Sequence, residues 1–337
     1  MYQVREAILT DELKKVEEFL ALHDLTLDKD IDKTLYLLDD DKIIGTISKA
    51  GSIMKCIAVD KSYQGEDLTG LLINKIVEKL SEENIFSYQL FTKIQYKPLF
   101  TSLGFNTIVE SEDAVMMEKG FETIYEKLDE MKSLIRHNLG KINPNSDIAA
   151  TVLNANPFTL GHQYLIEEMV KNHDKVILFL VEEDKSEFSF KERMALAYLS
   201  TARFKNVVII PSSKYMVSSL TFPSYFIHET NKKYKNIATM DAKIFKDYFM
   251  THLYIKKRYV GSESKDYMIE YNKILKLILG DSLVEVPRLT NDEGLVYSAS
   301  LVRNLIKENK IDEALKLIPN ECSLIFKGLV KDKYASR

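Results

Sequence analysis

The sequence predicts an α/β protein in which a Rossmann-like parallel sheet follows a smaller α+β unit. Apolar runs alternate with longer helical patterns from Ile148 onward, which is typical of βαβ units with parallel strands and right-handed crossovers. Ahead of them, several short strand-like runs surround one helical stretch. The 337 residues suffice for two cores, so we expect a domain at 1–120, a connecting helix and linker at 121–146, and a second domain at 147–337.

The first domain is expected to contain an antiparallel meander. Between Thr34 and Ala58, short apolar runs are separated by the turn-forming sequences Asp-Asp-Asp-Lys and Ala-Gly-Ser. A helix is predicted next, because apolar residues recur on one helical face at Leu68, Leu71, Leu72, Ile76 and Leu80. A strand at 86–91, a short helix at 96–103 and a strand around 114–117 complete the unit.

The connecting helix is predicted from an apolar stripe at helical spacing, which runs through Phe121, Ile124, Leu128, Met131 and Ile135. Gly140 ends this helix, with Pro144 beyond it. Five later apolar runs predict the strands of the parallel sheet, at 148–153, 176–181, 207–210, 259–260 and 283–286. In such open sheets, ligands bind beyond the carboxyl ends of the strands.

The composition is that of an ordinary soluble protein, with 45% hydrophobic and 28% charged residues. A net charge of -4 excludes a general polycation for duplex nucleic acid, so an anion must be bound by a local site. No apolar run is long enough to span a membrane, and the N-terminus lacks a signal-peptide pattern, so we expect a cytoplasmic protein. Cys56 and Cys322 are expected to be buried structural thiols, and no protein metal site is predicted.

The strongest candidate site begins where the strand at 148–153 leads into a helix. Pro157 blocks helix in the loop, Thr159 is expected to cap a helix that begins near Leu160, and Gly161 lets an anion approach the backbone. His162 falls in the first turn, where the helix dipole disfavours a positive charge by about 0.3–1 kcal/mol. Either His162 donates to a bound phosphate or it is a capping histidine bonded to a nearby loop.

A second helix start, in the sequence GLVYSASLVRNLIKE at 294–308, has the same arrangement. Ser298 or Ser300 is expected to cap the helix, and Arg303 lies in its first turn. The alternative is that Arg303 pairs with a neighbour such as Glu308 or Asp292. Two helix starts that carry a basic residue fit one shared polyanion, such as a triphosphate.

These two motifs resemble those of the nucleotidyltransferase superfamily. TLGH is similar to its HxGH signature, with Thr159 in place of the first histidine, and YSASLVR is similar to its late Ser/Thr-rich motif that ends in a basic residue. A P-loop is not predicted, since the chain contains no GxxxxGK[ST] sequence.

Further stretches resemble the citrate lyase ligase family in order through the C-terminal part: NANPFTLGHQYLIE, FSFKERMALA, TFPSYF, MDAKIFKDYF, RYVGSESKDYMIEYN, and EVPRL leading into YSASLVRNLI. The N-terminal part resembles the GNAT acyltransferase fold, in VDKSYQGEDLTGLLINKIV and YKPLFTSLGF. A GNAT-like domain joined to a nucleotidyltransferase domain is the layout of that ligase family.

The resemblance implies a reaction. ATP, acetate and the thiol of the citrate lyase acyl carrier subunit, which belongs to a dephospho-CoA-derived prosthetic group, give the acetyl thioester, AMP and diphosphate. Acetylation activates the lyase. Acetate is already ionised at pH 7, so its attack on the α-phosphorus requires positioning and charge neutralisation more than a general base. Mg²⁺ is expected with ATP, held mainly by phosphates and water.

The same resemblance implies the site residues. Thr159, His162 and Arg303 are expected to be catalytic. ATP or its phosphates are expected to contact eight others: Asn154, Asn156, Phe158, Gly161, Gly261, Glu263, Ser298 and Ser300. For Gly261 and Glu263 the alternative is an ordinary turn at a strand end, and for Arg193 it stays open whether it reaches phosphate or forms a salt bridge on its own helix.

The acyl-CoA loop of the first domain departs from the GNAT pattern. Gln64 and Gly65 are retained and are candidates for contact with a CoA-like arm, but Asp67 and Thr69 stand where glycines are usual. A carboxylate at Asp67 would repel pyrophosphate, so we do not expect independent acetyl-CoA-dependent transfer. The domain is expected to dock the arm or the carrier protein, or to serve as a scaffold.

Two other functions remain open from the sequence. The motifs also suit an adenylyltransferase of the pantetheine-phosphate or nicotinate-mononucleotide type, although this does not explain the attached first domain. A non-catalytic module that senses ATP and binds a partner is the second, because the loop at 64–70 is degenerate.

Overall fold

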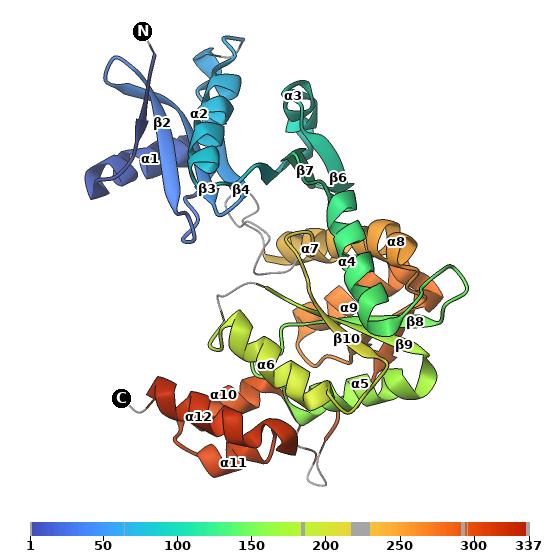
Figure 1. The fold of residues 1–337 in the computed structure, drawn as a ribbon. Helices are drawn as coiled ribbons and strands as arrows, with labels where there is room; N and C mark the ends of the chain where they lie inside the picture. The colour runs from blue at the N-terminus through green and yellow to red at the C-terminus, as the bar shows by residue number, and fades with distance from the viewer. Residues whose placement is uncertain are drawn as a thin grey trace. The chain divides into compact units, whose positions relative to one another are not determined.

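The computed structural model describes residues 2–63, 65–182, 186–216, 230–290, 294 and 296–334. The chain forms two compact units, Met1–Glu126 with Phe222–Met240 and Lys127–Thr221 with Asp241–Arg337 (Figure 1). We keep 1–120, 121–146 and 147–337 as a proposal for the domains. Within the described ranges, no helix is both long enough and apolar enough to cross a bilayer.

The first unit is built on a seven-stranded sheet in the order β1-β2-β3-β4-β5-β7-β6. Only β4 and β5 pair in parallel, and the other neighbours are antiparallel. The elements before the connecting helix are β1 Gln3–Glu6, α1 Thr10–Leu22, β2 Lys33–Asp39, β3 Lys42–Ala50, β4 Ile53–Val59, η1 Lys61–Tyr63, α2 Leu68–Glu82, β5 Ser87–Lys93, η2 Ile94–Tyr96, α3 Lys97–Ser102, β6 Asn106–Glu110 and β7 Ala114–Gly120. The predicted meander, helices and strands are confirmed, whereas β1, α1 and β6 were not predicted.

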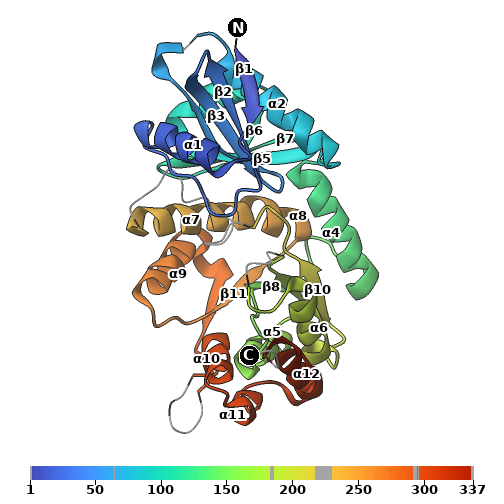
Figure 2. The same cartoon turned by 90° about the vertical axis from the view of Figure 1, so that its left-hand side faces the viewer.

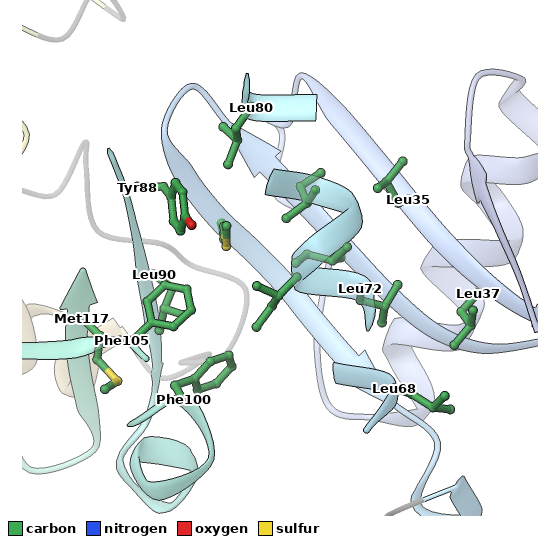
Figure 3. Close-up of a cluster of buried hydrophobic side chains, with 14 of the residues drawn as sticks. Leu35, Leu37, Leu68, Leu72, Leu80, Tyr88, Leu90, Phe100, Phe105 and Met117 are labelled. Carbon is green, nitrogen blue, oxygen red and sulfur yellow. The ribbon is translucent and has the colours of Figure 1, made fainter. Parts of the chain in front are cut away.

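The core of this unit forms where α2 packs on the sheet (Figure 3). Four of the five apolar residues predicted for this face are at most 4% exposed, and Leu71 is only half-buried. Burying each such leucine or isoleucine stabilises the fold by about 1.5–3 kcal/mol. Their partners in the cluster include Leu35, Leu37, Tyr88, Leu90, Phe100, Phe105 and Met117.

The connecting helix is α4, Ile124–Leu139. The stripe is confirmed for Ile124, Leu128, Met131 and Ile135, which are each at most 1% exposed. It is wrong for Phe121, which precedes the helix and is 87% exposed. Gly140 has a φ of +72°, the left-handed conformation that ends many helices.

The second unit contains a five-stranded sheet in the order β10-β9-β8-β11-β12, and every neighbouring pair is parallel. Its elements, with α7 beginning in the first unit, are β8 Ile148–Leu153, α5 Leu160–Asn172, β9 Lys175–Leu180, α6 Phe190–Thr201, β10 Val207–Pro211, α7 Thr230–Ile244, the π-helical segment η3 Phe245–Met250, α8 Thr251–Leu253, β11 Lys257–Gly261, α9 Asp266–Leu279, η4 Gly280–Ser282, β12 Leu283–Val286, α10 Ala299–Lys307, α11 Ile311–Leu315, η5 Asn320–Cys322 and α12 Ser323–Tyr334. All five predicted strands and the α/β class are confirmed.

Both faces of this sheet are covered, and Figure 2 shows α6 and α9 on opposite sides of it. Along β9, Leu178 and Leu180 join the cluster that includes α5 and α6, whereas the intervening Phe179 packs edge-on against Phe249 of η3, with ring centroids 5.5 Å apart. A strand buried on both faces reads as a continuous apolar run, which is why the sequence pattern located β9 so clearly.

The strand order fixes the position of a binding crevice. From β8 the chain continues to β9 and β10 on one side, and later returns to place β11 and β12 on the other side of β8. The order therefore reverses between β8 and β11, and the carboxyl ends of strands at such a switch point are where open α/β sheets bind ligands.

Candidate active site

A cavity of about 250 Å³ lies at this switch point. It is slightly smaller than the roughly 300–1,000 Å³ typical of pockets for drug-sized ligands. Its described lining comes from the ends of β8, β11 and β12 and from the first turns of α5 and α10, and consists of Leu153, Thr159, Gly161, His162, Tyr164, Leu165, Gly261, Glu263, Val286, Pro287, Arg288, Leu289, Tyr297, Ser298, Ala299 and Ser300. Seven of the predicted site residues therefore line one cavity: Thr159, Gly161, His162, Gly261, Glu263, Ser298 and Ser300.

The start of α5 is organised by Thr159, which is the N-cap as predicted. The backbone N–H of Thr159 donates to Nδ1 of His162 at 3.0 Å, and its hydroxyl lies 2.9 Å from the same atom. The N–H of Leu160 donates to the carbonyl of Leu317, whereas that of Gly161 has no partner among the described residues. The first turn therefore offers one free backbone donor, fewer than the end of an uncapped helix.

The capping contact fixes the chemistry of His162. A backbone N–H can only donate, so Nδ1 accepts and the neutral ring carries its proton on Nε2. Burial lowers the pKa of His162 to about 4, and the positive charge of Arg288 acts in the same direction. His162 is thus neutral near pH 7 and does not oppose the helix dipole. The capping interpretation is confirmed, and Nε2–H is left as a donor without a partner in the described part of the chain.

At the start of α10, Ser298 is the cap. Its Oγ accepts from the N–H of Leu301 at 3.2 Å, whereas Oγ of Ser300 accepts from Nη2 of Arg303 at 3.2 Å. Both serines line the cavity.

The two helix starts touch each other at Gly161. A Cβ on this residue would lie 2.3 Å from the carbonyl oxygen of Tyr297, the residue that precedes the Ser298 cap. No side chain fits at that distance. The two corners line one cavity, and Gly161 has a structural reason to be glycine as well, because protein fills the space at its missing Cβ. The approach of an anion to its backbone N–H stays a prediction.

Arg303 lies beside the cavity and is not part of its described lining. Its Nη1 donates to the carbonyl of Asn156, and Nε lies 3.8 Å from the carboxylate of Glu187. Of the two alternative partners, Glu308 pairs with Lys310, and Asp292 lies outside the described residues. The cation that the sequence placed in the site is therefore held by protein oxygens in this structure.

Arg288 is the cation that the structure places in the cavity. It follows the end of β12 by two residues, and its Nε donates to the carbonyl of Ser262 at 2.5 Å. Nη2 donates to the carboxylate of Glu263, and the backbone N–H donates to Oγ of Ser262 at 3.1 Å. Sequence reasoning missed this residue, although a basic side chain just beyond a strand end was a usable signal.

Gly261 ends β11, and Glu263 lies two residues beyond it. Burial raises the pKa of Glu263, and Arg288 opposes that shift. The carbonyl of Gly261 accepts from the side-chain amide of Asn272 at 3.1 Å. The segment after β11 lines the cavity, so contact of Gly261 and Glu263 with a nucleotide stays a prediction.

Asn154, Asn156 and Phe158 are not in the described lining. Phe158 is fully buried, and its ring centroid lies 5.4 Å from that of His162. Oδ1 of Asn156 accepts from the N–H of Phe188 at 3.0 Å. Their side chains shape the loop that carries α5, so the expectation of direct nucleotide contacts has no support from this geometry.

Arg193 is fully buried and ties this loop to its neighbours. It donates to the carbonyls of Asn154, Val181 and Phe188 at 2.9, 2.7 and 3.1 Å, and to Oδ1 of Asn154 at 3.0 Å. The guanidinium thereby joins the segments that follow β8 and β9, and the segment after β8 leads into the start of α5.

The described residues contain no group of three or more His, Cys, Asp or Glu side chains that could hold a metal ion. The described lining has one carboxylate, that of Glu263, and Arg288 engages it. This donor set fits Mg²⁺ that is bound through phosphate oxygens and water.

In the first unit, Gln64 lies outside the described residues. Gly65 has a φ of +98° and open space around it, as a loop glycine should. Asp67 precedes α2, and its Oδ1 lies 2.5 Å from where a Cβ on Gly70 would be. A carboxylate therefore covers the first turn of α2, the place where a pyrophosphate would need backbone N–H groups.

Comparison with known proteins gives a consistent result along the chain. A family model described as the citrate lyase ligase C-terminal domain matches residues 148–326. The citrate pro-3S-lyase ligase of Escherichia coli is 31% identical over 316 residues, which cover 91% of this chain and 88% of that protein. The Klebsiella pneumoniae protein of the same name is 32% identical over 326 residues, 94% of this chain and 93% of its own.

Solved structures with a likeness to 36% of this chain include an acetyltransferase of the GNAT family from Staphylococcus aureus, with 16% identity, a TM-score of 0.32 and 100% of that chain covered. An acyl-CoA N-acyltransferase from Pseudomonas aeruginosa has 11% identity and a TM-score of 0.31, and the likeness again covers 36% of this chain and 100% of the other chain. The acyltransferase fold of the first domain stays a prediction from its motifs. Since the family model spans more than half of the sequence and these relatives match nearly all of it above 30% identity, the chain belongs to the citrate lyase ligase family of enzymes.

Proposed function

We propose that this protein activates acetate with ATP and transfers the acetyl group to the thiol of the citrate lyase acyl carrier subunit. One observation carries the proposal: two helix starts that are far apart in the sequence line a single cavity at the switch point of a parallel sheet. The relatives named as ligases of citrate pro-3S-lyase support citrate lyase as the target.

The first step is adenylation of acetate. A carboxylate oxygen of acetate attacks the α-phosphorus of ATP, a P–O bond forms, and diphosphate leaves with the electron pair of the broken bond. The N–H of Gly161, Nε2–H of His162 and the hydroxyls of Ser298 and Ser300 are donors suited to the phosphate oxygens. Arg288 supplies the positive charge, and we assign Thr159 to orienting His162.

The second step is thioester formation. The thiolate of the carrier's dephospho-CoA-derived prosthetic group attacks the carbonyl carbon of acetyl-adenylate, a C–S bond forms, and AMP leaves. Both steps use the same phosphate donors, because the α-phosphate is the electrophile in the first step and part of the leaving group in the second. Mg²⁺, held by phosphate oxygens and water, would neutralise further charge on the triphosphate.

Arg303 is assigned a positioning role in this proposal. It bridges the Asn156 carbonyl before α5 and the Ser300 hydroxyl in α10, so it links the two helix starts. The first domain is proposed to dock the CoA-like arm or the carrier protein near Gly65 and Gln64. The carboxylate of Asp67 over the first turn of α2 argues against independent acetyl-CoA-dependent transfer by this domain.

The product assay that tests the proposal uses the full chain, ATP, labelled acetate and deacetylated citrate lyase. We expect the label on the carrier subunit, released by hydroxylamine as a thioester is, and one AMP formed per acetyl group. Formation of ADP instead of AMP, or acetylation that requires acetyl-CoA and not ATP, would refute it.

A further inference from the structure

The described lining of the cavity contains one permanent positive charge and one carboxylate, and they are bound to each other. Nη2 of Arg288 donates to the carboxylate of Glu263, and both side chains are partly exposed to the cavity, at 31% and 20%. The main phosphate-binding cation of the proposed reaction is therefore already paired with an anion.

Two adjacent N–H groups of the Arg288 guanidinium are already engaged. Nε–H donates to the Ser262 carbonyl and one N–H of Nη2 donates to Glu263, whereas Nη1 has no partner among the described residues. A guanidinium binds phosphate most strongly with two parallel N–H groups. An arriving phosphate that takes the parallel pair formed by Nε–H and Nη2–H has to displace one of the present acceptors. The carboxylate is the mobile one, because the Ser262 carbonyl belongs to the backbone.

We infer that Glu263 is a positioning residue which holds Arg288 in the empty cavity and is displaced from it by the polyphosphate tail of the nucleotide. This inference rests on the proposed function. Two anions that share one cation in a cavity of about 250 Å³ repel each other, so phosphate binding at Arg288 favours a carboxylate that has moved away. It can return to Arg288 as diphosphate leaves, which makes Glu263 a built-in competitor that weakens ground-state binding and favours product release.

The remaining charges near Glu263 do not replace this pairing. Lys265 lies two residues along the chain and Glu285 lies on β12, and they act on Glu263 in opposite directions. Neither lines the cavity. Glu285 is exposed, so it offers a matched control in which the same negative charge is removed nearby without touching the Arg288 contact.

The test measures binding of inorganic tripolyphosphate and of ATP by calorimetry to the unaltered chain, Glu263→Gln, Arg288→Ala, the double variant and Glu285→Gln. We expect Glu263→Gln to bind tripolyphosphate about two- to fivefold more tightly, the range of a partly exposed ion pair. Arg288→Ala should bind it at least about tenfold more weakly. The gain from Glu263→Gln should be smaller in the Arg288→Ala background than in the unaltered chain, and Glu285→Gln should match the unaltered chain.

Tighter binding cannot come from a damaged fold, so the gain itself is diagnostic. Unchanged or weaker tripolyphosphate binding by Glu263→Gln would overturn the inference, as would a gain of the same size in the Arg288→Ala background. Weaker binding of ATP alone would also overturn it, since Glu263 would then contact the nucleoside. If the unaltered chain binds neither tripolyphosphate nor ATP, both the proposed function and this inference are refuted. If the unaltered chain binds them but Glu263→Gln binds tripolyphosphate no more tightly, only this inference is refuted.

Discussion

The side chain of His162 is fixed by the helix that carries it. Because Nδ1 accepts the N–H of Thr159, the ring presents Nε2–H to the cavity as a neutral donor. A neutral donor stabilises charge that develops on phosphate without binding the ground-state triphosphate as strongly as a cation would. The residue type therefore suits both the helix start and the proposed chemistry.

Replacing His162 by alanine is expected to remove one preorganised donor to the reacting phosphate. The rate of acetate-dependent AMP formation should fall by a factor that corresponds to about 2–4 kcal/mol, as for loss of a single oxyanion donor. His252→Ala is the control, because His252 pairs with Asp129 and lies outside the described lining of the cavity. Equal losses in the two variants would contradict this role.

The pKa of His162 also predicts how stability depends on pH. In the folded chain the ring is neutral down to about pH 4, whereas the unfolded chain takes up the proton near pH 6.5. The unfolded state thus binds more protons between these values, and the free energy of unfolding falls as the pH drops from 6.5 to 4. Arg288 and the Thr159 cap are the groups that face the ring. Urea titrations should show a smaller fall for His162→Gln, and an identical fall would contradict the assignment.

Replacing the buried Arg193 is expected to have a large effect on stability. Its removal in Arg193→Met leaves three carbonyls without their donor in a buried position, so the free energy of unfolding should drop by about 3 kcal/mol or more. Arg203→Met is the matched control. Arg203 is 49% exposed and pairs with Glu167, and such a surface pair contributes at most about 1 kcal/mol. Similar melting temperatures for the two variants would show that Arg193 is not a structural clamp.

At the residue scale, the sequence predicted which helix starts matter but not which cation enters the cavity. Arg303 was chosen because it lies in a first turn, and Arg288 was missed because it belongs to the loop after β12. The direction of a long side chain depends on nearby acceptors, here the Asn156 carbonyl and Glu263, and their positions follow from tertiary structure. Spacing along one segment carries no information about them.

At the scale of elements, the central feature is the contact between the starts of α5 and α10. Gly161→Ala places a Cβ against the backbone of Tyr297, so the helices must separate. We expect a loss of about 1–3 kcal/mol in stability together with a loss of adenylation, since the two groups of donors no longer meet. Gly328→Ala, in α12, has open space at its Cβ and should instead be neutral or slightly stabilising. If Gly161→Ala retained full activity, the contact would have no role in the site.

Strong periodicity explains which elements were predicted. Strands buried on both faces and helices with a regular apolar stripe, such as α2, carry a clear pattern. The missed elements carry a weak one. Strand β1 has no buried residue, and α1 buries only Val16, Phe19 and Leu20 among many charged positions. Such elements form because they cover an edge or a face of the sheet, and the local hydrophobic pattern of the sequence does not reveal these tertiary contacts.

At the scale of the whole molecule, the parallel sheet makes the site possible. The order β10-β9-β8-β11-β12 brings the end of β8, early in the second unit, beside the ends of β11 and β12, which are formed late in the chain. The alternation of strands and helices predicted a parallel sheet and a ligand beyond its carboxyl ends. The order of the strands was not predictable from that alternation, because neighbouring strands of a parallel sheet need not follow each other in sequence.

The account depends on whether this cavity joins acetate to the α-phosphate of ATP. The most direct measurement is exchange of labelled diphosphate into ATP by the full chain, without citrate lyase, in the presence and absence of acetate. We predict exchange that requires acetate and is lost in Arg288→Ala. Exchange that instead requires pantetheine phosphate or nicotinate mononucleotide, or no exchange with any of them, would contradict the account.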